Sequence, residues 1–283
     1  MKIGEYQVSA VVPTRFRLDG GAMFGSVPKA LWSKKIVADE DNCIPLCCRV
    51  LVLESKSRRI LVDLGSGQKW DEKHRRIYNF SYHPGGPLHK LVPDVSDIII
   101  THLHFDHVGG VSYLNADGEL LLSYPEATHH IQKENWALAH APGPRERATY
   151  LSENITPLLN AKLNLLDGDS EILPGIEVVR SNGHTRGLQW VIVRAKDQTL
   201  VCPSELMPTA HHVSVPYVMG YDLHAEQTMK DKQSLAEQAV AEKWLLFFGH
   251  DRQTAAGVLA LDDKGRFVLA DSKEIPNYGE IEF

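Results

Sequence analysis

The 283-residue chain is long enough for one large layered domain, and its 43% apolar residues suffice for a sizeable core. No stretch approaches the roughly 20 consecutive apolar residues of a membrane-spanning helix, so we expect no membrane partner. The net charge of −6 and the lack of a basic stripe argue against nucleic acid as the main partner.

The N-terminus and the cysteines indicate a cytoplasmic protein. Residues 1–5 lack an apolar signal core, and the four cysteines show no paired Cys-x-x-Cys spacing. We therefore expect a reducing compartment. Cys47, Cys48 and Cys202 are predicted to be small apolar residues in or beside strands, without a redox or metal role.

The first quarter of the chain predicts three strands, at residues 6–12, 46–54 and 60–64. Between the first two lies residues 18–32, where three glycines and a proline predict a loop. This loop contains large apolar side chains, which either fold back on the core or line a pocket. They are Met23, Phe24, Leu31 and Trp32.

Residues 68–93 are rich in charge, histidine, glycine and proline. His74, His83 and His89 lie here without metal-ligand spacing, and we expect them to be solvated or locally paired. The segment 82–87 is predicted to be flexible and to form a lid or a dimer contact.

The densest cluster of ionisable residues follows the apolar run 98–100, which reads as a short buried strand. His102, His104, Asp106 and His107 come directly after it. Imidazole nitrogen and carboxylate oxygen suit zinc and neighbouring first-row metals. The sequence therefore predicts a metal site where this strand ends.

The middle of the chain predicts helices. Residues 126–140 have helical spacing of apolar residues, and His129, His130 and His140 are expected at surface positions on this helix. A second, shorter helix is predicted over residues 151–159.

Two further histidines repeat the pattern of a strand end, a glycine and a histidine. The predicted strand 176–180 is followed by His184, and the apolar run 245–248 stops just before His250. Between them the sequence predicts a hairpin, 189–195 with 199–202, and an amphipathic helix over 226–244.

The pattern His102-x-His104-x-Asp106-His107 resembles the first motif of the metallo-β-lactamase fold. The resemblance extends over nearly the whole chain through Gly183-His184, the segment 207–212 and Phe248-Gly249-His250-Asp251. The segment 19–25, Asp-Gly-Gly-Ala-Met-Phe-Gly, resembles the N-terminal loop of the YtnP-like branch of quorum-quenching lactonases. The resemblance thus points to the branch that opens N-acyl homoserine lactones and is related to methyl parathion hydrolases. It implies an α/β (α+β) fold, a four-layer αββα sandwich forming a single domain over residues 1–283, with the site at one edge.

The resemblance also implies a dinuclear metal centre. His102, His104 and His184 would hold one divalent ion, and Asp106, His107 and His250 the other. Zinc is the expected metal, with manganese, iron or cobalt as alternatives. The family's bridging carboxylate is usually Asp, and its position here is Glu205, which is longer by one methylene. The Asp63-Leu64-Gly65 triplet would support the metal loop from outside.

Two metal ions lower the pKa of a shared water, and the resulting hydroxide would attack a lactone or related ester. Asp106 and Glu205 would orient it and transfer a proton. By resemblance, Met23, Phe24 and Trp32 would form a pocket wall for an acyl chain. Lactonases of the better-known type place Tyr where this chain has Pro208. Residues expected to replace it are His211, His212 and Tyr221.

Two alternatives to the lactonase prediction stay open. A phosphotriesterase-like or thioester hydrolase would use the same metals. A diiron module sensing oxygen or redox state would not be an enzyme, and relatives of that type usually have Glu where His104 stands. The expected partner is a small ester or lactone substrate, and we also expect a homodimer.

Overall fold

The computed structural model describes residues 1–279 and contains two large β-sheets. The first has eight strands in the order β1-β2-β3-β4-β6-β9-β10, with β5 paired to β2. Its strands are β1 Lys2–Ile3, β2 Tyr6–Asp19, β3 Cys43–Glu54, β4 Arg59–Val62, β5 Ser81–Tyr82, β6 Asp97–Ile99, β9 Thr128–Gln132 and β10 Lys162–Leu166. Strands β4, β6, β9 and β10 run parallel, and β1 to β4 are antiparallel.

The second sheet has seven strands in chain order, β11 to β17. They are β11 Ser170–Leu173, β12 Ile176–Ser181, β13 Leu188–Arg194, β14 Thr199–Cys202, β15 Leu245–Phe247, β16 Ala256–Leu261 and β17 Phe267–Lys273. Only β14 and β15 pair in parallel. A separate two-stranded hairpin joins β7 Ser112–Leu114 to β8 Leu120–Leu122.

The helices are short except for one. The α-helices are α1 Gly20–Phe24, α2 Lys29–Trp32, α3 Glu72–Tyr78, α4 Leu88–Leu91, α5 Phe105–Val108, α6 Lys133–His140, α7 Ser152–Ile155 and α8 Ala225–Ala241. The 3-10 turns are η1 Gly109–Val111, η2 Thr156–Asn160, η3 Ser204–Leu206 and η4 Ala210–His212. None of the helices among residues 1–279 combines the length and apolar character needed to cross a lipid bilayer.

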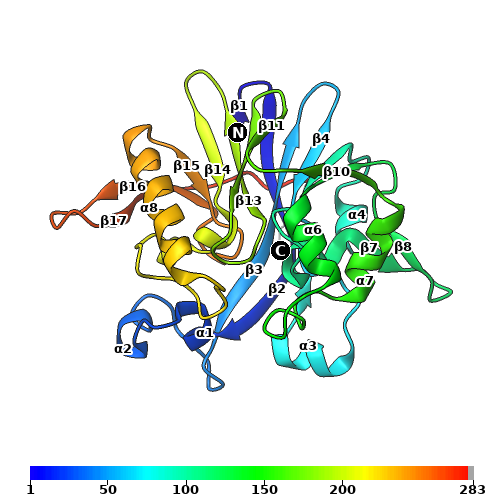
Figure 1. Ribbon diagram of the computed structural model, residues 1–283, viewed down its shortest axis with the longest axis horizontal. Coiled ribbons are helices and arrows are strands. Elements are labelled where there is room, and N and C mark those ends of the chain that lie inside the picture. Colours follow the sequence, from blue (N-terminus) through cyan, green and yellow to red (C-terminus); the bar gives the residue numbers. More distant parts are fainter. Residues whose placement is uncertain (280–283) are drawn as a thin grey trace.

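Alternating side chains along the strands build a separate core on each face of each sheet. In β3, Val50 and Val52 join the cluster beneath α4, α6 and α7, whereas Leu51 and Leu53 point to the cluster between the sheets. In β13, Val191 and Val193 enter that same inter-sheet cluster, and the alternate residues pack under α8. The result is a helix–sheet–sheet–helix arrangement, with α8 on one outer face and α6 and α7 on the other (Figure 1). The predicted αββα sandwich is confirmed.

The predicted helix over residues 126–140 is wrong in its first half. Residues 128–132 form β9, which pairs in parallel with both β6 and β10, and the helix α6 begins only at Lys133. His129 and His130 are buried, against the prediction of surface positions. A parallel strand with neighbours on both sides is covered on both faces, so its polar residues are enclosed too.

The segment 18–32 is also more ordered than predicted, because it contains α1 and α2. Asp19 caps α1 by accepting a hydrogen bond from the Ala22 N–H at 2.7 Å. Residues 68–93, for which no helix or strand was predicted, contain α3, β5 and α4. The three cysteines predicted to be small apolar residues are buried in β3 and β14, as expected.

Candidate metal centre

The His102–His107 motif is placed by the end of β6 and by one carboxylate. The strand ends at Ile99, and α5 begins at Phe105 with His104 as its N-cap residue. Asp63, which follows the neighbouring parallel strand β4, accepts hydrogen bonds from the Thr101 backbone N–H at 2.8 Å and the Thr101 hydroxyl at 2.9 Å. Asp63 thereby fixes the start of the loop that carries the four predicted ligands.

The structure brings the six predicted histidine and aspartate ligands together in two groups. In each group the candidate donor atoms all lie within 4.8 Å of one another. The first triad consists of His102, His104 and His184, and the second triad of Asp106, His107 and His250. Each triad takes two residues from the segment after β6 in the first sheet, where His102 and His104 precede α5 and Asp106 and His107 lie in it. The third comes from a strand end in the second sheet, β12 for His184 and β15 for His250.

Four of the five imidazoles are held through Nδ1, which leaves Nε2 directed inward. His102 Nδ1 lies 3.1 Å from the Thr101 hydroxyl, and His107 Nδ1 lies 2.8 Å from Asp63 Oδ2. The corresponding outer partners of His184 and His250, each at 2.8 Å, are the Asp222 carboxylate and the Cys47 carbonyl oxygen. Outer hydrogen bonds of this kind fix ring orientation and raise the basicity of the inner nitrogen.

His104 is turned the other way. Its Nδ1 lies 3.2 Å from His184 Nε2, and its Nε2 lies 3.6 Å from Oε1 of Glu146. Glu146 is buried and accepts a hydrogen bond from the Thr185 hydroxyl. His104 would therefore present Nδ1 to a metal, with Glu146 as its outer carboxylate.

Glu205 reaches the second triad. It lies in η3, just after β14, and its Oε1 is 2.8 Å from His250 Nε2 and 3.2 Å from His107 Nε2. The preceding residue, Ser204, adopts a positive φ of 50° and donates its hydroxyl hydrogen bond to Thr101 Oγ1. This turn brings the Glu205 carboxylate, which is only 6% exposed, up to the predicted ligands.

The charges around the two triads favour a cation. Burial disfavours the Glu205 carboxylate, but His250 and His107 outweigh that effect and hold the pKa of Glu205 well below its usual value. Burial likewise disfavours charge on His107, yet Asp106 and Asp63 raise the pKa of this imidazole well above normal. Burial and the surrounding imidazoles lower the pKa of His102, which favours the neutral form that metals bind.

The donor set fits divalent metal ions. The buried His102 Nε2 atom has no hydrogen-bond partner. Unpaired buried polar atoms are costly, so this nitrogen indicates that a further group belongs at the cluster. Imidazole nitrogens and carboxylates in sets of three, with positions left open, match catalytic zinc sites.

The expectation that Met23, Phe24 and Trp32 line a substrate pocket is wrong. The three side chains are at most 1% exposed and belong to a core cluster with Ile44 and Leu46. Side chains enclosed to this degree cannot contact a substrate in this conformation. In the segment 18–32, these large apolar residues therefore pack in the core.

Phe24 also determines the role of His212. The Phe24 ring stacks on Trp32 at 5.4 Å and on His212 at 4.7 Å between ring centroids. His212 is fully buried, and its ring nitrogens contact the Met23 carbonyl oxygen at 2.8 Å and the Thr209 hydroxyl at 2.7 Å. His212 therefore joins α1 to η4, and the prediction that it binds substrate is wrong.

The other two predicted substrate residues are more accessible. His211 is partly buried, and Tyr221 is 39% exposed. Burial of its hydroxyl raises the pKa of Tyr221, with smaller contributions from nearby acidic groups that include Asp106.

A group of aromatic residues beside Asp106 was not predicted. We call Trp70, Tyr78, Phe80 and Phe105 the aromatic wall. The Phe105 ring lies 5.2 Å from Trp70 and 5.3 Å from Tyr78, and Phe80 lies 4.9 Å from Trp70. Phe105 stands between two predicted ligands in the chain, so its position in the motif is the sequence signal that could have identified this surface. Glu146, in contrast, lies in a charged segment with no recognisable pattern.

Comparison with known proteins identifies the family. The sequence model of the Metallo-beta-lactamase superfamily matches residues 46–250. An N-acyl homoserine lactonase from a Bacillus species is 26% identical over 234 residues, which cover 76% of this chain and 84% of the relative.

Two solved structures extend the comparison to the whole fold. A crystal structure of a "probable metal-dependent hydrolase" from Staphylococcus aureus is 27% identical, has a TM-score of 0.84, and is matched over 97% of this chain and 100% of the other. AidC, a dizinc quorum-quenching lactonase, is 18% identical with a TM-score of 0.76 over 97% of both chains, which shows a shared fold. Because the family model spans most of the chain, the protein belongs to the metallo-beta-lactamase superfamily and is a metal-dependent hydrolase.

Proposed function

We propose that this hydrolase binds two zinc ions and opens the ring of a lactone, with N-acyl homoserine lactones as the substrate class. The observation that carries the proposal is the pair of triads, in which six candidate donor atoms from distant segments form two groups of three. The lactonase relative supports the substrate class.

In this proposal the first triad holds one ion and the second triad the other. Two such ions would supply a water of lowered pKa and would polarise the substrate carbonyl. Asp106 orients the attacking water and transfers its proton towards the leaving alkoxide, which ring opening leaves attached to the product. The outer partners Asp63, Asp222 and Glu146 hold the imidazoles in their directions.

Glu205 has the second proposed catalytic role. Its contact with His107 and His250 favours binding to the ion of the second triad through Oε1. Glu205 would hold that ion, and we propose that its negative charge would also favour binding of the ion of the first triad. Replacing Glu205 with Gln removes the charge but keeps the size, and we expect it to lower the affinity for at least one ion.

The aromatic wall is the proposed surface for the acyl chain. Burial, with a smaller contribution from Asp106, raises the pKa of Tyr78, which is half-buried and lies at the C-terminal end of α3. An acyl chain lying against these rings would gain roughly 0.8 kcal/mol for each buried CH₂. Tyr221, which is 39% exposed, is the proposed donor to the substrate carbonyl.

The test compares ring opening of butanoyl and decanoyl homoserine lactones by the zinc-loaded enzyme, with proton release as the signal. Tyr78→Ala is expected to lower kcat/KM for the decanoyl substrate roughly tenfold and for the butanoyl substrate less than threefold. Ile77→Ala, one residue earlier in α3 and 49% exposed, is the matched control and is expected to change neither.

The same enzyme preparation is assayed with a paraoxon-type phosphotriester and with a glutathione thioester. Cleavage of either compound without cleavage of lactones would refute the lactonase proposal and favour the corresponding hydrolase. A cellular role in destroying acyl homoserine lactone signals in the cytoplasm belongs to the same proposal, and the four free cysteines are consistent with a reducing compartment.

A further inference from the structure

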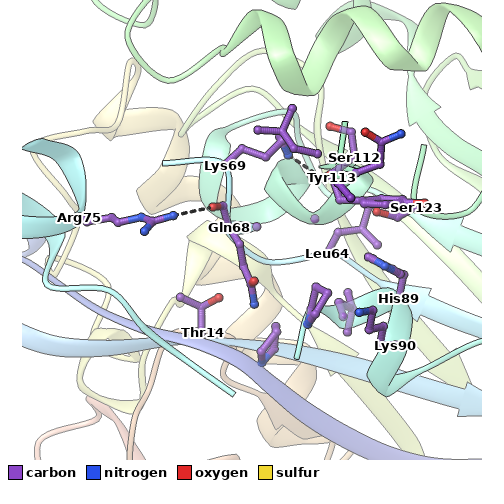
Figure 2. Close-up of a pocket in the computed structure, with 18 residues that line it drawn as sticks. Thr14, Leu64, Gln68, Lys69, Arg75, His89, Lys90, Ser112, Tyr113 and Ser123 are labelled. Atoms are coloured by element: carbon purple, nitrogen blue, oxygen red, sulfur yellow. Dashed lines mark hydrogen bonds between the residues drawn. The ribbon is translucent and has the colours of Figure 1, made fainter. Parts of the chain in front are cut away.

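A cavity of about 610 Å³ lies outside the metal centre (Figure 2). It is enclosed by the segment after β4, by α3 and α4, and by the β7–β8 hairpin. None of the seven predicted metal ligands lines it. Gly67 and Gly110 line the cavity, and the backbones of the two segments that carry them are in close contact. A Cβ on Gly67 would overlap the carbonyl group of Gly109, two residues after the predicted ligand His107.

The charged residues that line this cavity are all basic. Lys69, Arg75 and Lys90 contribute cations from three different segments, and no Asp or Glu lines the cavity. None of the three forms an ion pair with any carboxylate in the described part of the chain. In a chain with a net charge of −6, three unpaired cations around one cavity form a locally positive environment for an anion.

Lys69 is fixed in position by carbonyl groups, and the charge of the Glu153 carboxylate only partly offsets the effect of burial on its pKa. Its ammonium group donates hydrogen bonds to the carbonyl oxygens of Gly109 at 2.5 Å and Ser112 at 2.8 Å, which carry no net charge. Burial lowers the pKa of Lys69 to about 8, so most of the population remains charged at neutral pH. Figure 2 shows Arg75 entering from one side of the cavity and Lys90 from the opposite side.

The remaining wall suits a flat apolar group. The rings of His89 and Tyr113 pack at 4.3 Å between centroids with an interplanar angle of 30°, and Leu64 and Leu88 lie on the same cavity. Burial and the charge of Lys90 lower the pKa of His89, which favours the neutral ring as a surface for an apolar group. Aromatic and aliphatic walls with a few polar groups are typical of small-molecule sites.

We propose that this cavity, which we call the cationic pocket, is a second binding site for a small organic anion that carries a planar apolar body and a carboxylate or phosphonate-like group. The anionic group lies among Lys69, Arg75 and Lys90, and the apolar body lies against His89 and Tyr113. The site is separate from the metal centre, because none of the seven predicted metal ligands lines it.

The test measures binding of benzoate, phenylphosphonate and uncharged benzamide to the zinc-loaded protein by calorimetry. The variants are Arg75→Gln and Lys90→Gln, and Lys56→Gln in the exposed turn between β3 and β4 is the control. Each pocket variant is expected to weaken anion binding roughly two- to fivefold, the range for a partly exposed charge, and the double variant about tenfold. Lys56→Gln leaves binding unchanged, and benzamide does not bind.

A second readout locates the ligand. Bound anion is expected to raise the pKa of the His89 ring in a nuclear magnetic resonance titration, because it places negative charge beside the imidazole. Anion affinity that survives the double variant would mean that the carboxylate binds the metal ions, and it would overturn the proposal. Equal binding of benzamide, or no binding of either anion, would overturn it as well.

Discussion

The outer carboxylates predict how the affinities for the two ions can be changed separately. Asp222 lies 2.8 Å from His184 Nδ1 in the first triad, and Asp63 lies 2.8 Å from His107 Nδ1 in the second. Asp222 is completely buried, and its other oxygen accepts a hydrogen bond from the Met219 N–H at 3.1 Å. In Asp222→Asn one oxygen still faces His184, but the amide nitrogen then faces that N–H group.

Losing an outer partner typically lowers metal affinity 10- to 100-fold, which corresponds to about 1.4–2.7 kcal/mol. We expect Asp222→Asn at the lower end of this range and Asp222→Ala at the upper end, because Ala also leaves His184 Nδ1 without a partner. Asp63→Asn is expected to lower the affinity for the ion of the second triad by a similar factor. Its backbone φ of 64° is tolerated by Asn, so strain does not confound the comparison.

The assay is a zinc titration against a competing chelator dye, combined with metal analysis after dialysis against graded zinc buffers. The two single variants should weaken different binding steps, and the Asp63/Asp222 double variant should lose both, nearly additively. Circular dichroism at each zinc concentration checks that the fold is retained. If both variants weakened the same step, or if Asp222→Ala bound zinc like the wild type, the assignment of two separately supported ions would be wrong.

Three further predictions concern stability. Gly109→Ala is expected to lower the free energy of unfolding by roughly 1–3 kcal/mol, because the added Cβ would overlap the Ser66 backbone. The control Gly143→Ala has open space around the added Cβ and should change the free energy of unfolding by no more than about 0.5 kcal/mol. Both are measured by urea unfolding, and equal effects would refute this packing argument. Burial lowers the pKa of Lys232 to about 7, so between pH 7 and 10.5 the unfolded chain binds more protons than the folded one and stability rises with pH. Relative to Lys232→Met, the free energy of unfolding of the wild type should rise by at most about 1.4 kcal/mol per pH unit over this window. It is measured by urea unfolding at pH 7, 8 and 9. If the free energies of the two proteins changed in parallel with pH, the prediction would be contradicted. Removing metal with a chelator is expected to abolish ester hydrolysis and lower the Tm, with both restored by zinc; hydrolysis that persists in metal-free protein would exclude the metal mechanism.

The sequence located most of the candidate metal centre because the donors follow apolar strands. Residues 98–100 and 245–248 are unmistakable buried runs, and each is followed within a few residues by histidine. The resemblance to the metallo-β-lactamase fold, and not the strand pattern, assigned these distant donors to one site and selected Glu205, which contacts the second triad.

What the sequence could not decide were contacts between segments without a local pattern. Whether Phe24 lines a pocket or packs inside depended on His212, which is almost 190 residues away and stacks on its ring. His129 was misplaced because a histidine in a polar context reads as exposed, while pairing with β6 and β10 encloses it. Glu146 became recognisable only once His104 and Thr185 were seen beside it.

The split of each triad between the two sheets has a consequence for how the molecule assembles. Each ion would draw two ligands from the loop after β6 and one from a strand end of the opposite sheet, so loading either ion would tether the halves of the sandwich to each other. Part of the free energy of metal binding would then stabilise the docking of the two sheets against each other. The metal-free chain should therefore unfold less cooperatively than the metal-loaded one. Metal binding would thus act in the maturation of this enzyme as well as in its chemistry.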